Sequence, residues 1–313
     1  MPLYPLGAVY LPTENTTNHT LNNVEPQNVR MAQDLLRKAK DNDNPPRFCA
    51  VLRAMDSGRI ASVGTIMRIV DAEEQFHYGT DEIARIKLTC YAEELVEICS
   101  VKNGADWSQK RLTKSSDYLE AKVRPTVGGN DPSDETLETS AVREQLWGLV
   151  KDLRTIKTMY QLDLGAKDFP PESLPKIGDA IQDDCIGSAE DLESSFWRLA
   201  QEWQSVCYTL RQGQQSMLSA ERNERMVEAA CAKGGPLKLP IQMSDLEPEE
   251  RQEIQRMEME AQDRHVELGI DPVLDFQVLV SLPSLGERID WLGKMMTREK
   301  RRLTEAASLQ YSS

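Results

Sequence analysis

The stretch that decides the fold is RFCAVLRAMDSGRIASVGTIMRIV, residues 47–70. Before the turn signal DSG, apolar side chains alternate between two faces, one of which carries Phe48, Ala50 and Leu52. A repeat of two residues is typical of a β-strand, because successive side chains of a strand point to opposite faces. Asp, Ser and Gly are common in tight turns. We therefore predict two consecutive strands, residues 47–55 and 60–70.

Gly64 lies inside the second of these strands. A glycine in the interior of a strand weakens it, and usually marks a β-bulge or a point where another part of the backbone comes very close. We expect one of these two arrangements at Gly64.

The sequence on either side of this stretch predicts more strands, with one helix. Further strands are predicted over residues 1–11, 118–127 and, as two strands or one long bent strand, 83–101. The helix is predicted over residues 24–40. The polar segments 13–23, 71–81 and 102–116 are predicted to be loops. Five or six strands with one helix are the content of a small, partly closed β-barrel.

The second half of the chain has a different period. After a polar, acidic linker at residues 128–140, apolar residues recur at helical spacing. Two stripes are Val142, Leu146, Leu149, Leu153, Ile156 and Tyr160, then Leu192, Phe196, Leu199, Trp203, Val206 and Leu210. Pro248 starts a third helix, and Ser284 with Glu287 forms a capping box before a fourth. A bundle of about four helices is predicted. The alternative is a coiled coil, but Pro and Gly interrupt the segments.

Composition excludes several classes of protein. Hydrophobic residues make up 40% of the chain and charged residues 28%, as in ordinary globular proteins. No run approaches the roughly 20 apolar residues that cross a bilayer. The six cysteines are dispersed without a Cys-x-x-Cys pair, so we expect buried thiols in a reducing compartment.

The net charge of −14 is unevenly distributed. Residues 1–130 hold 17 acidic and 16 basic side chains, a net charge of −1, and the remaining residues hold 34 and 21, a net charge of −13. Affinity for nucleic acids depends largely on basic groups that neutralise phosphates. The balance therefore disfavours nucleic acid as a partner, and it supports a domain boundary near residue 130.

No combination of residues predicts catalysis, a metal or a cofactor. The three histidines, His19, His77 and His265, are predicted to be ordinary surface residues, and Glu74-x-x-His77 is a single metal-like spacing in a predicted loop. The acidic pairs are predicted to be solvated: Glu73–Glu74, Glu93–Glu94 and Asp183–Asp184. Gly286 to Met295 does not have the spacing or the hydroxyl of a phosphate-binding loop.

The tryptophans are the candidate aromatic contacts. Four are expected to pack in helices or to line a groove between barrel and bundle: Trp147, Trp197, Trp203 and Trp291. Trp107 lies in a polar loop and is the strongest candidate for a surface contact with a partner, since exposed aromatic residues are frequent anchors of protein interfaces.

Five segments resemble the N-terminal domain family of Lon proteases. They are LYPLGAV (residues 3–9), VEP (24–26) with Met31 beyond it, RFCAVL (47–52), GRIASVGTI (58–66) and LPSLGERIDWL (282–292). The resemblance implies an α+β chain, in which residues 1–130 form a PUA-like β-barrel lobe and residues 131–313 a helical bundle lobe. It also extends to stand-alone proteins of this kind in plants and algae.

The resemblance implies a non-catalytic module that recognises proteins, without the ATPase and protease parts of a Lon enzyme. We expect an adaptor or substrate receptor in protein quality control, whose partners are protein clients or a protease or chaperone, with no membrane partner. It holds them in an apolar groove or on a free strand edge. The alternatives are a PUA-like RNA-binding protein, a structural subunit of a larger assembly, and a hydrolase with an unrecognised site. The expected location is the chloroplast stroma if a transit peptide has been removed, and otherwise the cytoplasm.

Overall fold

The computed structural model describes residues 1–13, 17–42, 44–54, 57–80, 82–102, 118–126, 135–160, 189–232, 241–267 and 271–310. The chain divides into two compact units. The first comprises Met1–Leu146, Ile181–Gln201 and Val273–Leu292, and the second comprises Trp147–Ala180, Glu202–Pro272 and Gly293–Ser313. The boundary at residue 130 stays a prediction.

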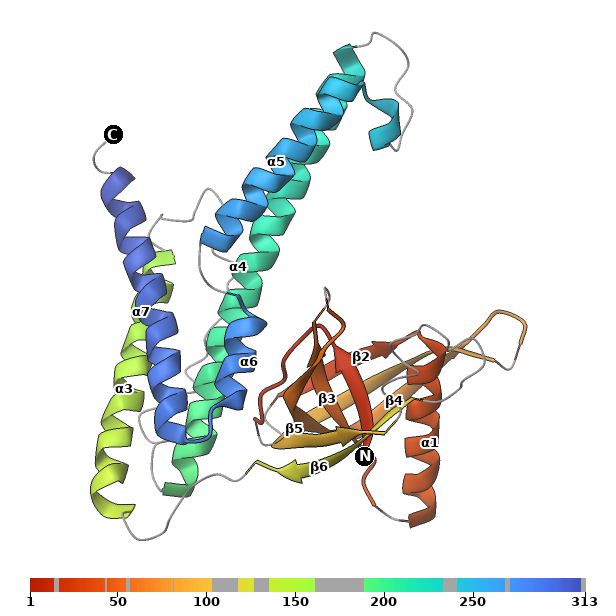
Figure 1. The fold of residues 1–313 in the computed structure, drawn as a ribbon, viewed down its shortest axis with the longest axis vertical. Helices are drawn as coiled ribbons and strands as arrows, with labels where there is room; N and C mark the ends of the chain where they lie inside the picture. Colours follow the sequence, from red (N-terminus) through yellow and green to blue (C-terminus); the bar gives the residue numbers. More distant parts are fainter. Residues whose placement is uncertain are drawn as a thin grey trace. The chain divides into compact units, whose positions relative to one another are not determined.

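The first unit contains a six-stranded sheet (Figure 1). Its strands are β1 (Pro2–Leu6), β2 (Asn18–Asn23), β3 (Arg47–Arg53), β4 (Ile60–Phe76), β5 (Ile83–Val101) and β6 (Leu119–Pro125). They lie in the order β2-β5-β4-β3-β1-β6, and β5 also pairs with β6. The pairings thus run in a closed circuit through β5, β4, β3, β1 and β6. Only β1 and β3 are parallel among these pairs.

The alternation predicted for β3 is confirmed, because its two faces belong to two hydrophobic clusters. Phe48 and Ala50 join the larger cluster, whereas Cys49 and Val51 join the smaller one. Helix α1 (Pro26–Asn42) contributes Val29, Met31, Ala32 and Leu35 to the larger cluster. The sheet is therefore packed on both faces at β3.

Gly64 lies at a close approach of two strands, as its position predicted. An ideal Cβ at Gly64 would lie 2.7 Å from the carbonyl oxygen of Ala50 and 2.7 Å from Sγ of Cys49. Real Cβ atoms do not come this close, so β4 lies this near β3 only because residue 64 has no side chain. Burial raises the pKa of the Cys49 thiol to about 12.

Two predicted loops are wrong in part, because polar residues continue the sheet. Residues 18–23 form β2, which pairs with β5 from Asn18 opposite Tyr91 to Asn23 opposite Ile86. Residues 71–76 extend β4, which pairs with β5 as far as Phe76 opposite Ile83. Edge and outer strands are solvated, so they need little apolar sequence, and main-chain pairing with β5 decides their conformation. Residues 83–101 form one long strand, with register shifts in its pairing with β4.

The predicted helices are confirmed, with shifts at their ends. They are α3 (Glu135–Met159), α4 (Ala189–Ala232), α5 (Pro248–Glu267) and α7 (Leu285–Gln310), together with the 3-10 turn η4 (Met243–Asp245). Helix α3 begins inside the predicted 128–140 linker, so that prediction is wrong for its last six residues. A short helix, α6 (Leu274–Ser281), was not predicted. The chain is thus a mixed α and β protein.

Both apolar stripes predicted for α3 and α4 are confirmed by burial. Leu146, Leu149, Leu153, Ile156 and Tyr160 are buried and Val142 is half-buried, whereas all six residues of the second stripe are buried: Leu192, Phe196, Leu199, Trp203, Val206 and Leu210. In the second unit α4 and α5 run side by side, as Figure 1 shows, and their contact includes Met226 and Ile254 together with Leu246. None of the described helices is long and apolar enough to span a membrane.

Candidate protein-binding surface

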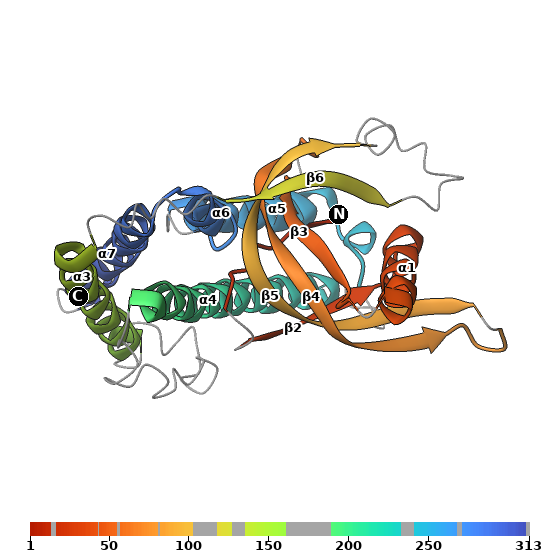
Figure 2. The same cartoon turned by 90° about the horizontal axis from the view of Figure 1, so that it is seen from below.

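The outer part of the β4–β5 hairpin extends beyond the other strands. Strand β3 pairs with β4 no farther out than Arg68, and β2 pairs with β5 no farther out than Ile86. Residues 71–80 and 82–85, here called the arm, therefore form a two-stranded ribbon whose described outer edges are unpaired. Figure 2 shows the ribbon running past α1. Two-stranded ribbons have little core of their own, so the arm is held mainly through its base.

The tip of the arm is an ordered turn. The amide of Thr80 donates to the carbonyl oxygen of His77 at 3.1 Å, and the amide of His77 donates to the carbonyl of Glu82 at 2.9 Å. Gly79 has a φ of +78°, which a type II turn requires at its third residue and which glycine adopts without strain. The turn places Tyr78 at its second position.

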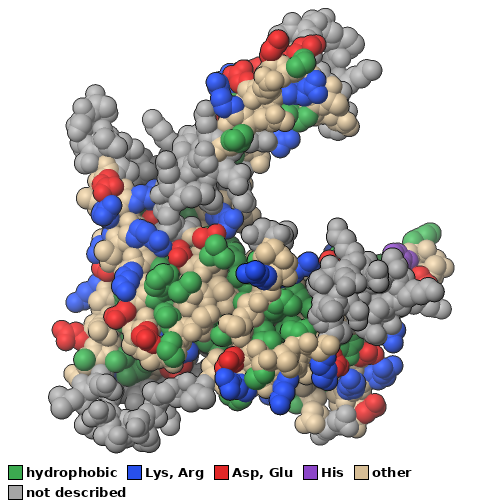
Figure 3. Space-filling view, viewed as in Figure 1, with side chains coloured by type: hydrophobic (Ala, Val, Ile, Leu, Met, Phe, Trp, Pro, Cys, Tyr) green, Lys and Arg blue, Asp and Glu red, His purple; other side chains and the backbone are tan. Residues whose placement is uncertain are grey.

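Apolar side chains gather at this tip. Tyr78 is 104% exposed and Phe76 is 55% exposed, whereas Ile83, opposite Phe76, is half-buried. At the right edge of Figure 3 the tip carries hydrophobic and histidine side chains. Aromatic residues are enriched at the energetic centres of protein interfaces, so their full exposure here indicates a contact surface.

Acidic side chains line the β4 strand of the arm. Asp71, Glu73 and Glu74 are all exposed. Glu73 pairs with Lys87 on β5 at 2.9 Å, and this hydrogen bond lowers the pKa of the Glu73 carboxyl. Among the residues that the structure describes, nothing pairs with the carboxylates of Asp71 or Glu74. The arm thus combines an aromatic tip with a negatively charged strand.

A cluster of charged residues ties the base of the arm to the sheet. Glu93 on β5 accepts from Nε of Arg47 at 2.6 Å and from Nε of Arg68 at 2.6 Å. The guanidinium of Arg68 also lies 5.4 Å from the ring centre of Tyr91. The bond to Glu93 raises the pKa of Arg47. These contacts join β3, β4 and β5 at the last paired residues before the arm.

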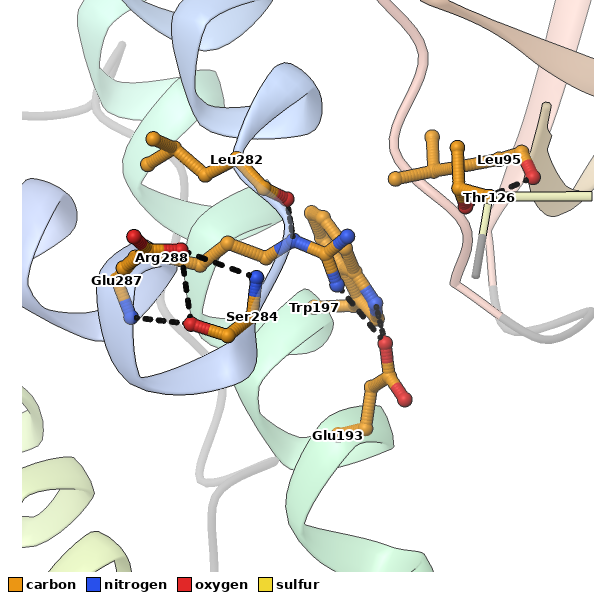
Figure 4. A network of polar contacts seen from close by, with 8 residues as sticks. All are labelled: Leu95, Thr126, Glu193, Trp197, Leu282, Ser284, Glu287 and Arg288. Atoms are coloured by element: carbon orange, nitrogen blue, oxygen red, sulfur yellow. Dashed lines mark hydrogen bonds and ion pairs between the residues drawn. The ribbon is translucent and has the colours of Figure 1, made fainter. Parts of the chain in front are cut away.

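The LPSLGER motif forms a second group of polar contacts in the same unit (Figure 4). The capping box is confirmed, because the amide of Glu287 donates to Oγ of Ser284 at 3.3 Å and that hydroxyl donates to Glu287 at 2.9 Å. Buried Arg288 donates to the carbonyl oxygen of Leu282 at 3.0 Å and to Glu193 at 3.1 Å.

Arg288 also lies over an aromatic ring. Its Cζ is 5.1 Å from the ring centre of Trp197, whose Nε1 donates to Glu193 at 3.3 Å. Burial lowers the pKa of Arg288, against the effect of Glu193. These side chains hold the turn between α6 and α7 against the start of α4, so the motif has a structural role.

Helix α6 carries a second exposed apolar surface. Leu274 and Val278, one turn apart, are exposed, and Figure 3 shows hydrophobic side chains around this helix. Gln277 donates from Nε2 to the carbonyl oxygen of Val63 on β4 at 3.3 Å, and Trp291 donates to the carbonyl of Asp275 at 3.0 Å. The charged residue of α6, Asp275, is half-buried, so exposed Leu274 and Val278 serve below as a matched control.

Two of the three histidines have a described position. His19 was predicted to lie on the surface in a loop, and this is wrong: it belongs to β2, is half-buried, and its ring centre lies 4.9 Å from that of Tyr10. Burial lowers its pKa. His77 is exposed at the tip, close in sequence to Glu74. His265 falls in α5, and its side chain lies outside the described residues.

The acidic pairs are not brought together as a catalytic site. Glu73 and Glu74 lie on opposite faces of β4, and Glu93 bridges two arginines instead of being solvated as predicted. Asp183 and Asp184 lie outside the described residues. No group of three potential metal ligands occurs within the described ranges of the chain.

The tryptophans do not supply the exposed contact. Trp197 and Trp203 are buried, Trp147 and Trp291 are half-buried, and Trp107 lies outside the described residues. Among the described residues, the exposed aromatic side chains are those of Phe76 and Tyr78, which lie in the segment 71–81 that was predicted to be a loop. The register shift between Ile69 and Asp71 interrupts the two-residue period of β4, so the apolar pattern up to Val70 does not continue to Phe76.

The solved structures that this chain resembles include two Lon N-terminal domains. One is a Lon N-terminal domain protein from Xanthomonas campestris, with 19% identity, a TM-score of 0.27, and matched segments covering 46% of this chain and 71% of that chain. The other is the N-terminal domain of the Mycobacterium avium complex Lon protease, with 13% identity, a TM-score of 0.31, and coverage of 64% and 96%.

Both neighbours belong to the family that the sequence motifs resemble. Each TM-score is below 0.5, so neither superposition supports a conclusion about the binding surface of this chain. Neither neighbour is a plant or algal protein, so that part of the resemblance stays a prediction. No protein-family model and no curated protein matches the chain.

Proposed function

We propose that this chain is a non-catalytic protein-recognition module of the Lon N-terminal kind, which binds extended or unfolded segments of other proteins as an adaptor or substrate receptor in protein quality control. One observation carries the proposal: the arm presents two exposed aromatic residues, Phe76 and Tyr78, at the end of a ribbon with unpaired strand edges. Apolar side chains beside free main-chain groups suit a partner that supplies an extended backbone.

The frame behind the arm supports the same proposal. The closed circuit of strand pairings from β5 through β4, β3 and β1 to β6 fits the PUA-like barrel that the resemblance implies. Of the motif residues, Gly64 allows the close packing of β3 and β4, and Arg288 forms hydrogen bonds to Leu282 and Glu193 that hold the turn before α7. We therefore assign the binding surface to the solvated hairpin and not to the part of the unit that carries the motifs.

The alternative of RNA binding is disfavoured by the charge of the arm. Asp71, Glu73 and Glu74 line its longer strand, and they would repel phosphates. The exposed aromatic residues suit stacking with bases, but the net charge of −14 leaves little attraction for a phosphate backbone.

A titration of the whole chain with one client in two states tests the proposed function. Reduced, carboxymethylated lysozyme is unfolded, whereas native lysozyme is folded and also basic, so the native form controls for simple charge attraction. Labelled lysozyme in each state is titrated with the chain and followed by fluorescence anisotropy. We expect binding of the unfolded form only. Equal binding of both forms, or of neither, would show that the chain does not recognise unfolded segments.

A further inference from the structure

The longer free edge of the arm belongs to β4. From Asp71 to Phe76 the only described strand neighbour of β4 is β5. An edge strand directs every second amide and carbonyl group away from its neighbour, so this edge offers free donors and acceptors along six residues, about 20 Å. On the other side of the ribbon, β5 is free of β2 only from Ile83 to Arg85.

The charges along this edge restrict what binds to it. Asp71 and Glu73 point to one face of β4, and Glu74 points to the other face with Ala72 and Phe76. Lys87 offsets Glu73, whereas Asp71 and Glu74 remain without an ion pair among the described residues. Opposite charges on neighbouring strands attract and like charges repel. A strand that carries basic side chains therefore fits the edge, and an acidic strand does not.

A second copy of the same edge is a poor occupant. It would bring its own Asp71, Glu73 and Glu74 against the first set. The pairing of β4 with β5 also shifts register between Ile69 and Asp71, where the free edge begins. Irregular pairing and charges are the usual protection of edges against association between copies. The edge is thus protected against pairing with a second copy of this chain, but it can pair with a strand of opposite charge.

We propose that residues 71–76 of β4 add an extended, basic segment of a client protein to the sheet as a further strand. This inference rests on the proposed function and names the class of client: segments in which Lys or Arg recur at every third position among apolar residues, so that basic side chains lie on both faces of the strand, as Asp71 and Glu74 do. Main-chain hydrogen bonds hold the segment, and Asp71 and Glu74 select its charge. Phe76 and Tyr78 contact its apolar side chains at the outer end.

Three labelled peptides test the mode of binding to the whole chain. The first has about ten residues, a length typical of a strand, and places a lysine at every third position with valines between, which matches the three-residue spacing of Asp71 and Glu74. The second replaces each lysine with glutamate, and the third is the lysine peptide with an N-methyl group on every amide. We expect the lysine peptide to bind about tenfold more tightly than the glutamate peptide, from two exposed charge pairs. The N-methylated peptide cannot donate along either edge and should lose most of this affinity.

A charge-reversed variant and a matched control test the location. Asp71→Lys/Glu74→Lys should prefer the glutamate peptide. Glu224→Lys/Asp290→Lys makes the same change in net charge at exposed helical sites and should keep the preference for lysine. An unchanged preference in the first variant, or full binding of the N-methylated peptide, overturns strand addition at β4.

The outcomes for the two proposals are distinguishable. If wild type binds unfolded lysozyme but the charge-reversed variant keeps its preference for the lysine peptide, only the edge site is overturned. If wild type binds the lysine peptide but not unfolded lysozyme, strand addition at β4 is supported and the proposed recognition of unfolded proteins is overturned.

Discussion

Gly64 on β4 lies against the carbonyl oxygen of Ala50 on β3 with no room for a side chain, since a Cβ on residue 64 would lie 2.7 Å from that oxygen. The contact belongs to strands that support the arm, because β4 continues from Gly64 into its free edge. At this spacing of β3 and β4, only glycine fits at position 64.

Gly64→Ala should lower the free energy of unfolding by about 1–3 kcal/mol, because the added methyl group forces β3 and β4 apart. Gly148→Ala is the matched control. Gly148 is exposed in α3 with nothing within 4 Å of its Cβ position, so that change should raise stability by up to about 1 kcal/mol. Urea unfolding followed by circular dichroism measures both. Equal stability of Gly64→Ala and wild type would show that β3 and β4 are farther apart than described.

Arg288→Met should destabilise the first unit by about 1–3 kcal/mol, since it leaves the carbonyl of Leu282 without a donor and removes the cation over Trp197. The comparison is Arg301→Met, which removes an 81% exposed guanidinium paired with Glu305 and should change stability by less than about 1 kcal/mol. Urea unfolding followed by Trp fluorescence reports the difference. If the two variants lose the same stability, the Arg288 contacts are not structural.

Stability should fall in acid through His19. Burial lowers its pKa in the folded chain below the ordinary value of 6.5, so the unfolded chain binds more protons as the pH falls through 6.5, and the free energy of unfolding decreases. The loss continues down to the lowered pKa of the folded state. His19→Phe should flatten this part of the stability profile between about pH 7 and 5, whereas His77→Gln, at the exposed tip, should not. A profile unchanged by His19→Phe would contradict the assignment.

The apolar strands could be predicted from the sequence, and the polar ones could not. Phe48 and Ala50 on one face, with Cys49 and Val51 on the other, give β3 a clear period of two. Asn18–Asn23 and Asp71–Phe76 lack such a pattern, because pairing with β5 and not burial fixes their conformation. Pairing between strands that are distant in sequence produces little recognisable pattern in the local sequence.

The candidate site was harder to predict than the fold for a related reason. Tyr78 is significant because it is exposed, and exposure depends on where the neighbouring strands end. In the same way, Ser284 and Glu287 were recognisable as a capping box from their spacing alone. The partners of Arg288 were not, since Glu193 and Trp197 are more than 90 residues away in sequence.

Removing the aromatic tip should abolish recognition while leaving the fold intact. Phe76→Ser/Tyr78→Ser removes exposed side chains only, so stability should stay within about 0.5 kcal/mol of wild type. Affinity for unfolded lysozyme should fall by about tenfold or more, as for interface anchors. The control Leu274→Ser/Val278→Ser removes the exposed apolar residues of α6 and should keep binding. Loss of binding in the control but not in the tip variant would move the site to α6.

Hydrogen exchange of the main-chain amides, with and without unfolded lysozyme, tests the central claim most directly. An added strand would donate and accept along β4, so amides of residues 71–76 should exchange more slowly in the complex, while those of α5 should be unchanged. Binding that leaves residues 71–80 and 82–85 exchanging as in the free chain, with protection elsewhere, would contradict the assignment of the arm as the recognition surface.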